Sequence, residues 1–135
     1  AMPFYAFLHP VLAVATLVWG IVIAQVSLQR MADWDFPLRR VRARTIVYFL
    51  LCAANFGAGL LFNALLSSRK LVLPAHLTLG IVVCVLALLA LLATLVPGKP
   101  GHLPGLMRWH PVLTVASLAL IITQGFLTAL RLLRL

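Results

Sequence analysis

Histidine is the residue type through which this chain could carry out chemistry. The 135 residues include four histidines but only two acidic residues, Asp33 and Asp35. His9 lies at the start of one long apolar run and His76 at the start of another. Two imidazoles that face each other across the core of a helical bundle have the arrangement that bis-histidine ligation of haem requires. His9 and His76 are therefore the first candidate site.

Residues expected near these histidines would complete such a site. Gly80 follows His76 by four residues and so shares its helix face, while Gly57 and Gly59 lie in the nearer half of the second apolar run. Glycine allows a flat ring to approach closely. Four residues are expected at the same membrane face, where the cations among them would pair with haem propionates: Asn63, Arg69, Lys70 and Arg131.

Plainer interpretations of the same residues stay open. A histidine at a membrane interface often bonds to solvent or lipid headgroups. Asn55, Gly59 and Asn63 share one helix face at i, i+4 and i+8, which favours hydrogen bonding between helices over contact with a quinone. Cys52 and Cys84 lie in apolar runs without a CxxC spacing, so we expect them to fill the core.

The composition shows which elements must position these side chains. Hydrophobic residues make up 64% of the chain, charged residues 10%, and the mean hydropathy is +1.12. Soluble domains are about 45–50% apolar and about 25% charged, so the chain belongs to the membrane class. The net charge of +9 comes from short clusters between apolar runs, which indicates membrane topology and argues against nucleic-acid binding.

Four apolar runs are long enough to cross a bilayer, at residues 4–28, 45–66, 74–96 and 111–130. Pro10, Pro74 and Pro111 lie early in three of them, where a helix tolerates proline, and Pro97 ends the third. Short connections make successive helices antiparallel neighbours. We therefore predict an all-α fold: one integral membrane up-down four-helix bundle that occupies residues 1–135.

The basic residues predict the orientation of the bundle. The expected loops at residues 29–44 and 98–110 carry seven Lys and Arg, whereas the other loop and the C-terminal tail carry four. The positive-inside rule then places both termini on the non-cytoplasmic side of an inner or plasma membrane. Ala1 before Met2 resembles a cloning scar, and the first apolar run is expected to be a retained helix.

Several kinds of chemistry are excluded. No acidic residue falls inside an expected span, which argues against a proton-coupled transporter. The sequence contains no P-loop and no HExxH motif.

His110 would lie at the opposite membrane face from His9, and its diagonal partner should come from residues 44–48, which contain no histidine. His102 lies in a Gly/Pro loop.

A short segment of the first apolar run is similar in sequence to a segment at the start of the fourth. Residues 8–17 and 109–118 are identical at seven of ten positions, including the His-Pro pair. In helices that run in opposite directions this would be an inverted repeat. Chance is the alternative, because Val, Leu and Ala are common in this chain.

These features resemble the four-helix cytochrome b561-like membrane family, including its branch of unknown function. The resemblance rests on His9-Pro10, the segment Ala75-His76-Leu77-Thr78-Leu79-Gly80, the segment Leu95-Val96-Pro97 and the segment Arg108-Trp109-His110. It implies two b-type haems that pass electrons across the membrane, commonly from ascorbate or a quinol. His9 and His76 would ligate one haem and His110 the other, but Thr45 or a neighbour stands where a fourth ligand is expected.

The leading hypothesis is a small membrane b-type cytochrome that binds one haem b, with His110 as a weaker second site. As an electron carrier or oxidoreductase, it would exchange electrons with a quinol or a redox protein. One rival is a non-redox subunit or assembly factor of an oligomer or larger membrane complex. Another is a protein that binds a chlorophyll-type tetrapyrrole through a single histidine, for which His110 would need no partner.

Overall fold

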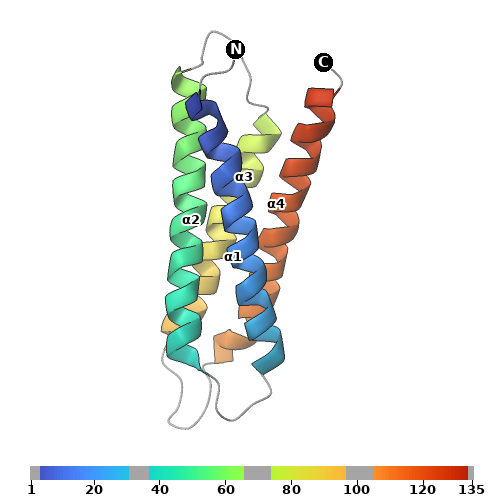
Figure 1. Ribbon diagram of the computed structural model, residues 1–135. Coiled ribbons are helices and arrows are strands. Elements are labelled where there is room, and N and C mark those ends of the chain that lie inside the picture. Colours follow the sequence, from blue (N-terminus) through green and yellow to red (C-terminus); the bar gives the residue numbers. More distant parts are fainter. Residues whose placement is uncertain (1–3, 31–36, 66–73, 97–104, 134–135) are drawn as a thin grey trace.

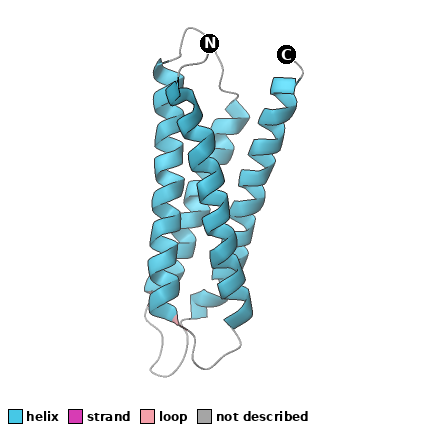
Figure 2. Cartoon of the chain, in the orientation of Figure 1, coloured by secondary structure: helices cyan, strands magenta, loops and turns pink. Residues whose placement is uncertain are grey.

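The fold is helical throughout the part of the chain that the structure describes. The structure is a computed structural model, and it describes residues 4–30, 37–65, 74–96 and 105–133. No strand occurs among these residues, so the predicted all-α class is confirmed (Figure 2). The long helices are, in chain order, α1 (Leu8–Arg30), α2 (Leu38–Leu65), α3 (Pro74–Leu95) and α4 (His110–Leu133). Two short 3-10 helices, η1 (Phe4–Phe7) and η2 (Gly105–Trp109), precede α1 and α4.

Each long helix has the length and composition needed to cross a membrane. The four apolar segments are Leu8–Val26, Leu38–Leu65, Pro74–Leu95 and Gly105–Arg131. A bilayer crossing takes about 20 helical residues, and even the shortest of these segments has 19. Large hydrophobic side chains cover the outside of the bundle, as in Val14, which is 61% exposed.

Helix α2 begins earlier than the sequence analysis predicted. The second span was expected from residue 45, but α2 starts at Leu38, and its first turn is closed by the Val41 amide, which donates to the Pro37 carbonyl at 3.0 Å. Leu, Arg and Ala favour helix, and the positive charge of the arginines does not prevent helix formation. The arginines assigned to the first loop at 39, 40, 42 and 44 therefore lie on the first turns of a helix.

The four long helices form a bundle in which each packs against two neighbours. Helices α1 and α3 each contact α2 and α4, so α1 and α3 are diagonal partners. In Figure 1, α1 and α3 run downward and α2 and α4 run upward. We call the end where α1 and α3 begin, next to the N and C marks, the upper end, and the opposite end the lower end.

Small residues allow the helices to pack closely in the lower half of the bundle. Ala87 and Ala90 of α3 are completely buried, and a cluster around Ile23 and Tyr48 forms the core. A side chain on Gly20 of α1 would lie 2.8 Å from Tyr48 Cε2, so this close approach requires glycine. Close packing of small residues is a usual way to hold membrane helices together.

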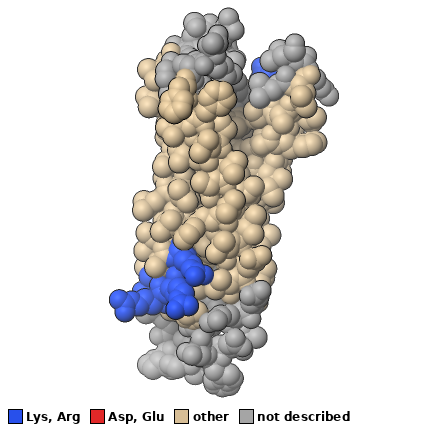
Figure 3. Space-filling view, viewed as in Figure 1, with Lys and Arg blue, Asp and Glu red and all other residues tan. Residues whose placement is uncertain are grey.

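The upper end is more open. From Ile122 to Arg131 every residue of α4 is exposed except Gln124, so the end of α4 has left the core. Figure 1 shows α4 diverging there from α1, and the space-filling view in Figure 3 is hollowed between them. The upper end therefore has an opening toward the outside of the bundle, and this is the end that carries His9 and His76.

Candidate functional site

The structure brings His9 and His76 together across the core. The two rings come from diagonal helices, their centres are 6.1 Å apart, and their planes make an angle of 71°. Imidazole nitrogens bind metal ions such as Zn²⁺ at about 2.0–2.1 Å, so two rings that ligate one ion from opposite sides have centres roughly 6 Å apart. The separation of the two rings matches that spacing.

Helix α2 holds the His9 ring. Nδ1 of His9 lies 3.0 Å from the backbone carbonyl oxygen of Asn55, and since a carbonyl can only accept, Nδ1 carries the proton and donates. In the neutral ring, Nε2 then keeps its lone pair. Metal-bound histidines usually donate their other ring nitrogen in this way, because the bond fixes the tautomer and the ring orientation.

Gly59 makes this contact sterically feasible. A Cβ atom at Gly59 would lie 3.1 Å from Cε1 and 3.3 Å from Nδ1 of the His9 ring. Gly59 was predicted to make room for haem, but the structure places its open side against the imidazole. Gly57, two residues earlier, faces open space. The two glycines therefore have different surroundings, although both were predicted to make room for a ring.

Helix α4 holds the helix turn that carries His76. The side-chain amide of Gln124 donates from Nε2 to the His76 carbonyl oxygen at 2.8 Å. The open side of Gly80 faces Phe56, whose Cδ2 would lie 3.2 Å from an added Cβ, and Gln124, whose Nε2 would lie 3.7 Å away. Gln124 was not among the residues predicted for the site. The one sequence feature that could have identified Gln124 is that it is a lone amide in an apolar stretch near the end of the fourth span.

Asn55 also contributes an acceptor without a partner. Its side-chain Oδ1 is buried and makes no hydrogen bond among the described residues. Leaving a buried acceptor unpaired costs about 1–3 kcal/mol. Asn55 therefore has one backbone carbonyl that accepts from His9 and one buried side-chain oxygen without a partner among the described residues.

The remaining predicted residues are less closely tied to the histidine pair. Asn63 is exposed near the end of α2, and Arg131 is exposed in the last turn of α4. Both belong to the upper end, as expected, but among the described residues no hydrogen bond joins either of them to His9 or His76. Arg69 and Lys70 lie outside the described residues.

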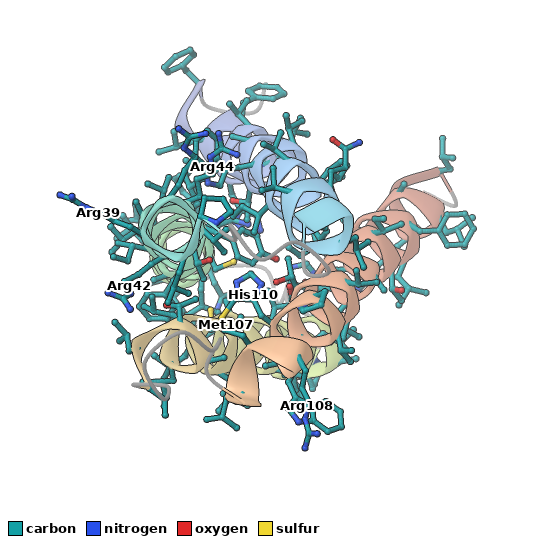
Figure 4. The ribbon with its side chains drawn as sticks, turned by 90° about the horizontal axis from the view of Figure 1, so that it is seen from below. Arg39, Arg42, Arg44, Met107, Arg108 and His110 are labelled. Carbon is teal, nitrogen blue, oxygen red and sulfur yellow. The ribbon has the colours of Figure 1, made fainter. Side chains whose placement is uncertain are left out.

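His110 lies at the lower end and is already hydrogen-bonded. It is completely buried, and Figure 4 shows it directed into the centre of the bundle beside Met107. Its Nε2 is 2.9 Å from the hydroxyl oxygen of Thr45 on α2. The Thr45 hydroxyl donates its own proton to the Val41 carbonyl at 2.8 Å, so it accepts from Nε2–H of His110. The nitrogen that a metal would need is thus used as a donor.

Other concave or reactive features lie away from the histidine pair. An open groove between α1 and α4 is lined only by apolar residues of the lower half, which include Leu28 and Pro111. Cys84 Sγ is 3.7 Å from the Cys52 carbonyl oxygen, and both cysteines are free. No group of three or more His, Cys, Asp or Glu side chains gathers among the residues that the structure describes.

Comparisons of the chain with protein-family models, with curated proteins and with solved structures found no match. The resemblance to the cytochrome b561-like family therefore rests on the quoted motifs alone. The fold and the site define the chain only as an all-helical protein with four helices able to span a membrane.

Proposed function

We propose that this chain is an integral membrane b-type cytochrome: an up-down four-helix bundle that binds one haem between His9 and His76 and carries electrons. The observation that carries the proposal is the pair of imidazoles at 6.1 Å, one of them fixed by a carbonyl so that its Nε2 is available. Paired axial histidines from facing helices are a common way to hold haem in a bundle.

The distribution of arginine supports the membrane orientation. Among the described residues with placed side chains, five arginines lie toward the lower end, at 39, 40, 42, 44 and 108, and one, Arg131, lies toward the upper end. The positive-inside rule then places the lower end in the cytoplasm and both termini on the other side. The histidine pair would lie near the non-cytoplasmic face.

Two features of the upper end support haem binding. Gly59 has no side chain to displace the His9 ring, and the residues of α4 from Ile122 to Arg131, apart from Gln124, are exposed at the same end of the bundle. A haem held by His9 and His76 would supply one-electron transfer. The protein's part is to hold the imidazoles and exclude water, and the Asn55 carbonyl makes His9 a stronger donor.

The lower end favours a single haem. His110 would have to give up its bond to Thr45 before Nε2 could ligate, and Thr45 itself supplies no nitrogen. A membrane quinol or a redox protein that reaches the upper end is the proposed electron partner. This partner class follows from the position of the pair near one membrane face.

The test is an optical spectrum of the full chain, purified in mild detergent after expression with ample haem. We expect a reduced-minus-oxidised spectrum of a low-spin b-type haem. His9→Ala and His76→Ala should each lose or strongly alter the Soret band, whereas His102→Ala serves as the matched control and should retain it. A colourless protein, or Soret bands unchanged in both variants, would refute haem binding. Extraction and mass spectrometry of the pigment would distinguish haem from a chlorophyll-type tetrapyrrole, and a stable complex without pigment would favour a non-redox subunit.

A further inference from the structure

The lower end carries a cluster of guanidinium groups that haem binding does not use. Arg39, Arg40, Arg42 and Arg44 lie within six consecutive residues of α2, and Lys and Arg side chains gather low on this helix in Figure 3. Arg39 and Arg40 are exposed, and the two acidic residues of the chain, Asp33 and Asp35, lie outside the described residues. Like charges three or four residues apart on a helix repel each other, so a bound anion would stabilise this end of α2.

Arg42 is fixed in place within this cluster. Its Nε and Nη2 atoms both donate to the Thr94 carbonyl oxygen near the end of α3, at 3.1 and 2.6 Å. A guanidinium has five N–H groups, so the contact leaves the remaining N–H groups of Arg42 for another acceptor. Because the side chain is already held, it loses little conformational freedom when it binds a ligand.

The neighbours of Arg42 along α2 indicate the class of ligand. Residues 39, 42, 46 and 50 recur at helical spacing and therefore form one stripe. Its first two members are Arg39 and Arg42, and the next two are Ile46 and Leu50, which are 40% and 58% exposed. Figure 4 shows Arg39 and Arg42 directed outward on the side of α2 away from His110. The stripe thus changes from two cations to exposed hydrocarbon over about one helical turn.

We infer that Arg39 and Arg42 bind the phosphate of an anionic phospholipid, whose acyl chain lies along Ile46 and Leu50. Arginine forks match phosphate oxygens, and the apolar half of the stripe suits a lipid better than a soluble phosphate. Arg42 is the preorganised anchor, and Arg39, one turn earlier, closes on the same phosphate. The inference rests on the membrane-spanning part of the proposed function and does not depend on haem.

The test titrates phosphatidylglycerol into the full chain in a neutral detergent and follows the first bound lipid by native mass spectrometry, with phosphatidylcholine as the reference lipid. The test variant combines Arg39→Lys with Arg42→Lys, which keeps both positive charges but removes both guanidinium groups. The matched control variant combines Arg40→Lys with Arg44→Lys. The Arg39/Arg42 pair should bind the first phosphatidylglycerol about tenfold more weakly, the effect of losing one charge-assisted hydrogen bond. The control pair should stay within about twofold of the wild type, because the total charge is unchanged.

Three outcomes would overturn the inference. One is equal loss in the two double variants, and another is no preference of the wild type for phosphatidylglycerol over phosphatidylcholine. The third is displacement of the lipid by inorganic phosphate at matched concentration, which would assign the arginines to a soluble anion. Since Arg42→Lys removes the contact to Thr94, Arg39→Lys alone is measured as well, and its helical content is compared with the wild type by circular dichroism. Loss of haem with retained lipid selectivity would refute the cytochrome while leaving the lipid site intact.

Discussion

Replacing Gly59 by alanine tests whether the tight contact between α2 and His9 controls the imidazole that we propose as a haem ligand. The added Cβ would lie 3.1 Å from Cε1 and 3.3 Å from Nδ1 of the ring. Carbon atoms in contact prefer about 3.5–4.0 Å, so the ring must retreat by a few tenths of an ångström. The bond from Nδ1 to the Asn55 carbonyl, now 3.0 Å, would then pass the upper limit of about 3.2 Å for such bonds.

The effect of losing that hydrogen bond on haem affinity can be predicted. Removing a partner of a metal-bound histidine typically costs 10- to 100-fold in metal affinity, or about 1.4–2.8 kcal/mol. We therefore expect Gly59→Ala to bind haem about 10- to 100-fold more weakly. The midpoint potential should rise, because a less basic imidazole stabilises ferric iron less than before. A tenfold difference between the two iron states corresponds to about 59 mV for one electron.

Gly57→Ala is the matched control, since it changes the same residue type two positions away. No atom lies within 4 Å of a Cβ added there, so haem affinity and potential should both stay unchanged. Affinity is measured by titrating haem into protein made without it, and the potential by a spectroscopic redox titration. The reasoning is refuted if Gly59→Ala keeps the wild-type affinity and potential, or if Gly57→Ala loses as much.

Three further predictions concern the lower half. Thr45→His places a second imidazole beside His110 and should raise the haem content per chain in a pyridine haemochrome assay; an unchanged content would show that more than a ligand is missing. Tyr48→Phe removes the hydrogen bond to the Ser117 hydroxyl and should lower stability by about 0.6 kcal/mol in a thermal or denaturant assay, with the haem spectrum unchanged, and a shifted spectrum would contradict this. Gly20→Ala puts a Cβ 2.8 Å from Tyr48 Cε2 and should cost about 1–3 kcal/mol, whereas an equally stable variant would show that the helices can separate freely.

The composition allowed much of the fold to be predicted. Four long apolar runs separated by Pro, Gly and Arg leave few alternatives to four apolar helices, since a membrane requires every backbone group to be paired within its segment. The start of α2 was harder to predict. Hydropathy marks where the apolar part of a helix begins, but α2 continues through Arg39 and Arg40 because those residues also favour helix.

The sequence predicted that His9 and His76 lie at a similar depth in the bundle, but it did not predict whether their helices are rotated so that the two rings face each other. Both begin helices that start at one end of a bundle, which sets their height. Whether they face each other depends on rotation, and each residue turns a helix by about 100°. Two contacts at the pair involve a backbone carbonyl at Asn55, which no sequence pattern marks, and the side-chain amide of Gln124, which stands out only as a lone amide in an apolar stretch.

The two His-Pro helix starts show how one local motif can acquire two roles. His9 and His110 each lie in the first turn of a helix, at opposite ends of the bundle, and each imidazole is bonded to α2. His9 uses Nδ1 on a carbonyl and is left facing another imidazole, His76, at the open end. His110, which is completely buried, uses Nε2 on the hydroxyl of Thr45. The difference therefore lies in the partner helix, because the motif places a histidine at each end and α2 determines which ring nitrogen is bonded to it.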